Sequence, residues 1–213
     1  MRIIVFGASG NCGRHFVRLA AAHGHAVTAV VRNGSQGGSS PNVTVVRGDV
    51  LDAGFVAGTI RGQDAVMSGL GIRYRHPWAA RQSPDDFISR ATTNIVGGMR
   101  ASGVSRISAI SAAGVGDSRP ILNLPMRFLV AASNVGVAYA DLDRVEEVLR
   151  SSGLDWQAVR PTTLTHKPAT GRVRQTTRYP ATATIPREDV AAFMLDELER
   201  SQFTARTPMI TVT

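Results

Sequence analysis

A glycine-rich turn directly behind a buried strand constrains this fold more than any other feature of the sequence. Residues 2–6 are apolar after the first arginine and predict a strand, and residues 11–23 predict a helix. Between them the glycines Gly7, Gly10 and Gly13 follow the spacing G-x-x-G-x-x-G. Such a turn is either a tight connection without a ligand, or a site where a diphosphate meets the unpaired N–H groups of a helix N-terminus. We favour the second reading and predict a cradle formed by Gly7, Ser9, Gly10, Asn11, Cys12 and Gly13.

Strand and helix patterns alternate along the 213 residues, which predicts an α/β fold with a doubly wound, Rossmann-type parallel sheet. Strands are expected at residues 2–6, 26–31, 43–46, 64–68, 106–110, 155–159, 182–185 and 208–212, the last closing the sheet. Helices are expected at 11–23, 85–102, 136–151 and 187–200. We predict a single NAD(P)-binding domain over residues 1–213, with a small loop-rich C-terminal substrate region mainly at 112–135 and 161–186. Residues 120–135 are apolar and could pack as core or cover a substrate as a lid.

Composition narrows the classes of partner. The net charge is +8, but the arginines are scattered and Lys167 is the single lysine, so we expect no nucleic-acid partner. The least charged stretch, 120–139, is interrupted by Arg127, and we expect no membrane span. Cys12 is the single cysteine, which excludes an intrachain disulfide, and a strand at residue 2 leaves no room for a signal peptide. We therefore expect a cytoplasmic protein with a small-molecule substrate, and the sequence leaves its oligomeric state open.

The choice of dinucleotide is predicted at the end of the second strand. Arg32 lies 19 residues after Gly13, and no Asp or Glu precedes Asp49. In dinucleotide folds an acidic residue at about this position binds the ribose 2′-OH of NAD, whereas an arginine accommodates the 2′-phosphate of NADP. We therefore predict NADP(H) as the cofactor. Asp49, at the end of the third strand, is a candidate for the adenine amino group, with a helix cap by Asp49 or Asp52 as the alternative.

Several motifs together resemble a known family. They are residues 7–13, 48–52, 62–66, 70–71, 160–161 and 187–191. They resemble atypical short-chain dehydrogenase/reductases of the NAD(P)H-binding, NmrA-like group, especially flavin reductase/biliverdin-IXβ reductase-like proteins, over nearly the whole chain. The resemblance implies that Arg32 holds the 2′-phosphate and that Asp49 and Val50 flank the adenine. It also implies that Leu70 and Gly71 follow the middle of the cofactor, and that Ser111, Pro161, Thr162, Thr163 and Leu164 line the nicotinamide.

The chain departs from this family at the positions that carry chemistry. The dehydrogenase pair Tyr-x-x-x-Lys is missing, because Asp143 stands four residues after Tyr139. Flavin reductases of this type tend to carry a histidine where Thr163 stands here. Ser111 and Thr163 are the catalytic candidates, with hydrogen bonds to local turns as their alternative role. Cys12 is expected to be a packed residue rather than a nucleophile, and no metal site is expected because the five histidines are dispersed.

Three functions remain open from the sequence. The first is an NADPH-dependent reductase that transfers hydride to a conjugated acceptor such as a flavin, quinone or related ring compound. The second is a non-catalytic NADP sensor or regulator of NmrA type. The third is a tailoring enzyme that reduces, isomerises or cyclises a specialised metabolite. An anionic substrate is a further hypothesis, based on two groups of basic loop residues that could also simply be solvated: Arg73, Arg75 and Arg81, and Arg172, Arg174 and Arg178. The loop histidines His76 and His166 are weaker candidates for proton transfer.

Overall fold

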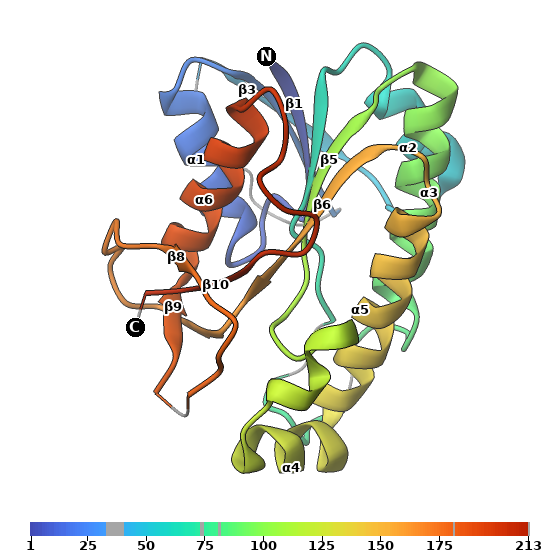
Figure 1. Cartoon of the computed structure of the whole chain (residues 1–213). Helices are drawn as coiled ribbons and strands as arrows, with labels where there is room; N and C mark the ends of the chain where they lie inside the picture. The colour runs from blue at the N-terminus through green and yellow to red at the C-terminus, as the bar shows by residue number, and fades with distance from the viewer. Residues whose placement is uncertain (33–40, 73–74, 81, 181, 213) are drawn as a thin grey trace.

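The computed structural model describes residues 1–32, 41–72, 75–80, 82–180 and 182–212. Its centre is a sheet of eight strands in the order β3-β2-β1-β4-β5-β6-β10-β8 (Figure 1). The strands are β1 (Arg2–Phe6), β2 (Ala26–Val31), β3 (Val43–Arg47), β4 (Ala65–Ser68), β5 (Arg106–Ile110), β6 (Asp155–Pro161), β8 (Arg174–Gln175) and β10 (Met209–Thr211). A small second sheet pairs β7 (Thr163–Thr165) with β9 (Thr184–Pro186) in parallel.

Helices cover both faces of the large sheet. They are α1 (Gly13–Ala22), α2 (Ala53–Ile60), α3 (Phe87–Ser102), α4 (Leu124–Ala132), α5 (Asn134–Arg150) and α6 (Arg187–Glu199), with a 3₁₀ turn η1 at Gly116–Ile121. Figure 1 shows α1 and α6 on one face and α2, α3 and α5 on the other. This is the doubly wound α/β architecture that the sequence predicts.

The alternating side chains of β1 show how the two helix layers share one sheet. Its four apolar residues are fully buried, and their side chains alternate between the faces of the sheet. Ile4 and Phe6 belong to the core under α2, α3 and α5, whereas Ile3 and Val5 belong to the core under α1 and α6. A strand that is buried on both faces reads as one continuous apolar run, which is why the sequence locates it without error.

The C-terminal edge of the sheet differs from the sequence expectation. The last strand, β10, lies between β6 and β8 rather than at the edge, and β8 pairs with it antiparallel. The short strand expected at 182–185 is β9, shifted to Thr184–Pro186 and paired with β7 outside the large sheet. Both differences arise from pairings between distant segments, which the local sequence pattern does not encode.

Most of segment 120–135 is helical, and only part of it belongs to the core. Asn123 caps α4 by accepting from the N–H of Met126 at 3.0 Å, with Pro125 in the first turn. Leu124 and Phe128 are 77% and 70% exposed, whereas Leu122 is buried in the core and Met126 and Val130 pack against it. The segment therefore packs as core only in part. Helix α2 is absent from the elements that the sequence predicts. Its N-cap, Asp52, is one of the two predicted cap candidates and accepts from the N–H groups of Gly54 and Phe55.

In the described ranges, no helix combines the length and apolar character needed to cross a bilayer.

Candidate functional site

The predicted cradle forms at the carboxyl end of β1. Gly7 has φ +77°, and its carbonyl accepts from the N–H of Gly10 at 2.9 Å, which closes the turn before α1. A Cβ atom on Gly13 would lie 2.1 Å from the Gly7 oxygen, and one on Gly7 would lie 2.8 Å from the Gly69 oxygen. Side chains at these positions would therefore collide with backbone, so the turn requires glycine. Among the described residues, the backbone N–H groups of Asn11 and Cys12 have no hydrogen-bond acceptor and are available to an anion.

Cys12 packs into the protein at the base of this turn. Its side chain is buried, and burial raises the pKa of the thiol to about 11, against the lowering effect of the Arg187 and Arg14 charges. A neutral, buried thiol is a poor nucleophile. The geometry therefore supports the packing role that the sequence predicts for Cys12.

A groove runs from the glycine turn along the carboxyl edge of the sheet. Parallel register places the ends of β2, β1 and β4 side by side, because Phe6 pairs with both Val30 and Ser68. The groove is lined by Gly7, Ser9, Gly10, Val30, Val31, Arg32, Gly48, Val50, Gly69, Leu70, Gly71, Ser83 and Phe87. Seven of these residues are predicted cofactor contacts: Gly7, Ser9, Gly10, Arg32, Val50, Leu70 and Gly71. Ligands of open α/β sheets bind in such crevices outside the carboxyl ends of the strands.

The groove continues beyond Arg32 into a second hollow. Its lining residues are Arg32, Gly48, Asp49, Leu51, Gln82, Ser83, Pro84 and Phe87. Asp49 is exposed there, and its Oδ1 accepts from the N–H of Leu51 at 2.9 Å. Its contact with adenine stays a prediction. Ser83 and Phe87 were not predicted, although their position just before and within the first turn of α3 could have indicated this edge.

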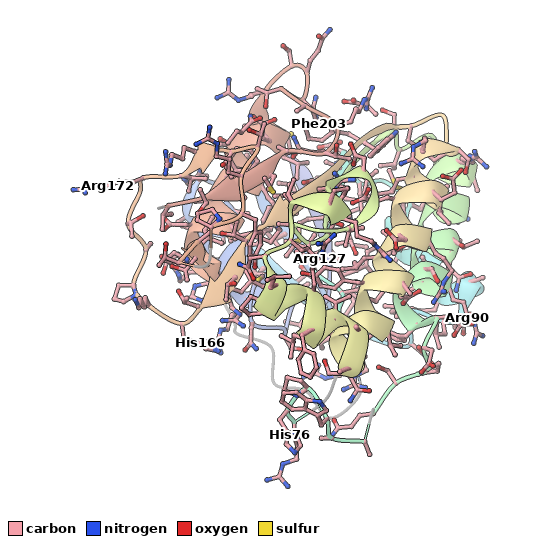
Figure 2. The ribbon with its side chains drawn as sticks, turned by 60° about the horizontal axis from the view of Figure 1, so that its bottom comes forward. His76, Arg90, Arg127, His166, Arg172 and Phe203 are labelled. Carbon is pink, nitrogen blue, oxygen red and sulfur yellow. The ribbon has the colours of Figure 1, made fainter. Side chains whose placement is uncertain are left out.

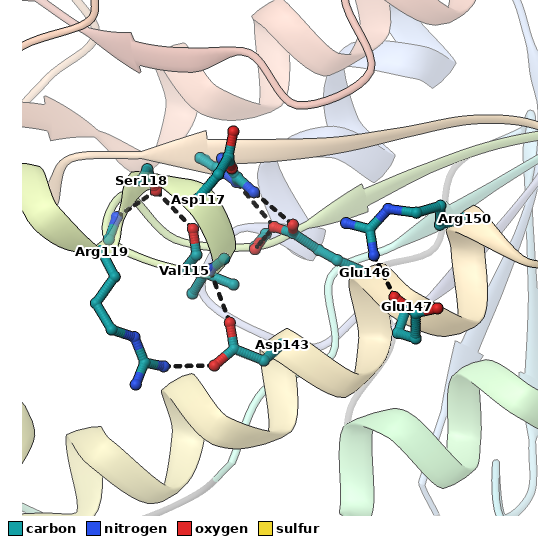
Figure 3. A network of polar contacts seen from close by, with 12 residues as sticks. Val115, Asp117, Ser118, Arg119, Asp143, Glu146, Glu147 and Arg150 are labelled. Atoms are coloured by element: carbon teal, nitrogen blue, oxygen red, sulfur yellow. Dashed lines mark hydrogen bonds and ion pairs between the residues drawn. The ribbon is translucent and has the colours of Figure 1, made fainter.

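Ser111 occupies a buried polar network rather than the groove. It follows β5, is 3% exposed, and donates from Oγ to Glu146 Oε1 at 2.6 Å. Arg160 on β6 donates to both oxygens of Glu146, from Nε at 2.9 Å and from Nη2 at 2.6 Å. Arg160 Nη1 also contacts Asp117 at 2.5 Å. Figure 3 shows Glu146 and Asp117 within this network of polar contacts.

In this network one guanidinium, that of Arg160, pairs with the carboxylates of Glu146 and Asp117. Burial alone would lower the pKa of Arg160, but the hydrogen bonds and charge of Glu146 and Asp117 outweigh burial and raise that pKa. The hydrogen bond from Arg160 lowers the pKa of Asp117. Both shifts favour the charged forms, so the guanidinium remains a fixed cation beneath the end of β5.

The other predicted nicotinamide residues lie at the end of β6 and in β7. Pro161 ends β6, Thr162 is buried with its hydroxyl 3.2 Å from that of Thr211, and Leu164 is half-buried. The exposed Thr163 lies with its hydroxyl 2.8 Å from the hydroxyl of Tyr179. In the described part of the chain these residues are not among those that line the groove at Gly7 and Arg32.

The two described tyrosines have different surroundings. Tyr139 is buried and donates its hydroxyl to the carbonyl of Ala113 at 3.0 Å, so this proton is used inside the core. Tyr179, which the sequence gave no reason to select, has a raised pKa because it is buried, although its hydrogen bond with Thr163 lowers that pKa. The raised pKa keeps the Tyr179 phenol protonated at neutral pH.

The predicted basic loops reach the surface at separate places. His76 and Arg172 project outward on different sides of this edge (Figure 2). Arg172 lines a hollow together with Lys167 and Thr170, next to β7 and β9. Asp189 fixes that loop by accepting from the N–H groups of Thr170 and Gly171 at 2.9 and 3.0 Å. Arg73 and Arg81 lie outside the described residues, as do residues 34–40.

Comparisons with known proteins agree with this geometry. The profile of a family described as NAD(P)H-binding matches residues 7–201. A chloroplastic protein of Arabidopsis thaliana of uncharacterised function is 28% identical over 180 residues, which is 81% of this chain and 62% of that protein's length. The protein YwnB of Bacillus subtilis is 37% identical over 71 residues, covering 33% of this chain and 32% of YwnB.

Solved structures share the fold. The anaerobilin reductase ChuY of Escherichia coli O157:H7 superposes with a TM-score of 0.79 at 24% identity, covering 99% of this chain and 96% of ChuY. The oxidoreductase ylbE of Lactococcus lactis gives 0.82 at 17% identity, covering 99% and 90%. A short-chain dehydrogenase/reductase of Veillonella parvula in complex with NADP gives 0.79 at 16% identity, covering 98% and 93%.

Proposed function

This chain belongs to the NAD(P)H-binding family, and from that premise we propose that it is an NADPH-dependent reductase that transfers hydride to a conjugated acceptor, such as a flavin, a quinone or a related ring. The family match confirms the predicted resemblance and the nicotinamide dinucleotide cofactor. The preference for NADPH, the acceptor and a cytoplasmic location are our proposals. The observation that carries the proposal is the continuous groove from the glycine turn to Arg32.

The residues of the groove fit this cofactor. Glycines leave the backbone bare where a diphosphate would lie, and the N–H groups of Asn11 and Cys12, which have no acceptor among the described residues, lie just before α1. Arg32 stands exposed at the junction of the groove and the second hollow, where it would pair with a 2′-phosphate. Gly69, Leu70 and Gly71 would follow the middle of the molecule. When bound, the reduced nicotinamide supplies the hydride.

The residues around the acceptor are proposed to work by position. Glu146 and Arg160 hold Ser111 in one rotamer, so we assign Ser111 a positioning role beneath the end of β5. The exposed Thr163, paired with Tyr179, is the residue we assign to contact the acceptor. Proximity and orientation alone can account for several kcal/mol of a barrier, roughly 7–11 at the upper limit. A conjugated acceptor spreads the arriving charge and can take its proton from water, which suits a site without a dedicated tyrosine–lysine pair. The name of ChuY, an anaerobilin reductase, supports the same class of reaction.

A non-catalytic NADP sensor is the second candidate, and one observation favours it. The hydroxyl of Ser111 is buried and bonded to Glu146, which leaves the end of β5 without a free polar hydrogen on that side chain. A tailoring activity has no specific support among the described contacts.

Two measurements separate these functions. Calorimetry of the purified chain with NADPH and NADH tests the cofactor, and loss of NADPH absorbance with a panel of FMN, riboflavin and quinones tests the reductase. We expect NADPH binding together with turnover of at least one acceptor. NADPH binding with no turnover of any acceptor would favour the sensor, and no binding of either dinucleotide would overturn both.

A further inference from the structure

Three potential metal ligands meet at the edge of the sheet opposite the groove. The Nδ1 atom of His23 lies 3.0 Å from Glu199 Oε1, and the Nε2 atom of His25 lies 2.7 Å from the same oxygen. The three ligand atoms all lie within 4.8 Å of one another. His23 caps the end of α1, His25 precedes β2, and Glu199 ends α6, so the cluster joins three elements near the start of the chain in Figure 1.

The turn between α1 and β2 brings the two imidazoles together. Gly24 has φ +82°, a left-handed conformation that glycine adopts at little cost. It reverses the chain, so that the ring centroids of His23 and His25 come to 6.4 Å. The nitrogen of Met1 lies 3.3 Å from His25 Nδ1, which holds the ring with its Nε2 toward Glu199.

The donor set has the chemistry of a zinc site. We propose that His23, His25 and Glu199 bind one Zn²⁺ ion, with water completing the coordination. Two imidazoles and one carboxylate are a known zinc set, and ligands around a tetrahedral zinc lie roughly 3.3 Å apart, given bonds of about 2.0–2.1 Å. The distances of 2.7 and 3.0 Å already approach that spacing. Small rotations of the three side chains would bring their ligand atoms to the spacing that zinc requires.

Exposure leaves room for the ion and its water. The side chain of His25 is 12% exposed, that of Glu199 33%, and that of His23 46%. One ligand is therefore anchored inside, while the opposite side of the cluster faces solvent. A metal here would link the end of α6 to the α1–β2 turn, so it would stabilise the layer of α1 and α6. The sequence expectation of no metal site considered the histidines alone, and the carboxylate stands 174 residues after His25.

The test is a titration of Zn²⁺ into the full chain without a polyhistidine tag, measured by calorimetry. We expect one Zn²⁺ per chain with a Kd below roughly 10 μM, and at least a tenfold weaker Kd in Glu199→Gln, which keeps the volume and a hydrogen-bond acceptor. His25→Gln should weaken binding further. The matched control is the double variant His76→Gln/His166→Gln, which removes two exposed imidazoles elsewhere and should bind Zn²⁺ like the wild type.

Three further readouts distinguish loss of the metal site from loss of folding. Zn²⁺ should raise the Tm of the wild type and of the control but not of Glu199→Gln, and Co²⁺ should give visible absorption bands typical of four-coordinate N/O ligands. NADPH affinity should be the same with and without Zn²⁺, because the groove lies at the other edge. Equal Zn²⁺ binding in the wild type and Glu199→Gln, or no saturable binding in the wild type, would show that the cluster is a hydrogen-bonded clamp only and would overturn the proposal.

Discussion

The Ser111 hydroxyl donates to the carboxylate of Glu146 at 2.6 Å, and Arg160, on the neighbouring strand β6, donates to the same carboxylate. This contact ties the loop after β5 to α5 and β6 in the interior. Because the side chains of Arg160 and Glu146 are only 4% and 1% exposed, neither can exchange its partner for water. The position of Ser111 therefore depends on an ion pair that the fold cannot easily break.

Replacement of Glu146 should destabilise the protein strongly. Glu146→Ala leaves Arg160 as a buried charge with only the exposed Asp117 as partner, which we expect to cost about 3–5 kcal/mol. The neighbouring Glu147 is the matched control, because its side chain is 68% exposed and pairs with Arg150 at the surface. Glu147→Ala should change stability by less than about 1 kcal/mol. Urea unfolding of both variants measures the difference, and similar losses in the two would contradict the assigned role of the buried pair.

Ser111 and Tyr139 should differ in their effect on turnover. Tyr139→Phe removes a hydroxyl that bonds to Ala113 in the core, so kcat should stay within about threefold, under 1 kcal/mol of barrier. Ser111→Ala should lower kcat more, with little change in KM, without abolishing turnover. Steady-state kinetics on folded, NADPH-binding variants gives the comparison. A roughly thousandfold loss in Tyr139→Phe would identify Tyr139 as the acid and refute the positioning mechanism.

Arg32 should select the cofactor. A charge-assisted contact with a phosphate is worth about 1.5–3 kcal/mol, so Arg32→Ala should weaken NADPH binding by more than about tenfold while NADH binding barely changes. Arg61→Ala, at an exposed position after α2, is a control that should affect neither. Equal losses for NADPH and NADH in calorimetry would remove Arg32 from the 2′-phosphate site.

The sequence predicts the parts of this molecule that are specified locally. Strands β1, β2 and β5 have the predicted bounds because each is a mostly apolar run whose residues are largely buried. The positions of the glycine turn and of Arg32 are also specified locally, because the spacing within one βαβ unit determines where they lie. In contrast, β8 consists of two exposed residues, and only its pairing with β10 makes it a strand.

Long-range contacts explain what the sequence reading missed. Ser111 was correctly placed at the end of β5, but its partner Glu146 lies 35 residues later, on a helix whose packing decides which carboxylate becomes buried. Glu147 next to it has the same chemistry and remains at the surface. Phe87 was also missed, because its position in the groove depends on how α3 meets the strand ends.

The buried thiol of Cys12 should give stability a dependence on alkaline pH. Its folded-state pKa is about 11 against an ordinary 9.0, so the contribution of the neutral thiol is fully present below pH 9.0 and is lost as the pH rises through 11. Between about pH 8.5 and 10.5 the wild type should lose on the order of 2 kcal/mol more than Cys12→Ala. Urea unfolding across this range provides the values, and parallel curves for the two proteins would contradict the raised pKa.

Basic residues in the loops near the substrate region should make the KM for an anionic acceptor depend on salt concentration. If Arg172 and its neighbours attract the substrate, KM for FMN should rise with ionic strength while KM for a neutral quinone stays nearly constant, because salt screens exposed charges. Arg172→Ala should reduce this salt dependence, and Arg61→Ala should not. A KM for FMN that is as insensitive to salt as that of the quinone would leave these arginines as ordinary solvated residues.

The two-residue strand β8 limits strand addition at one edge of the large sheet. An unpaired sheet edge is a template for intermolecular strand addition, and proteins block such edges with short, charged or irregular segments. Here the free side of β10 is taken by Arg174 and Gln175, both exposed, and the chain turns away after two residues. At this edge of the sheet, strand β8 therefore offers a neighbouring molecule only two residues for strand pairing, one of them cationic.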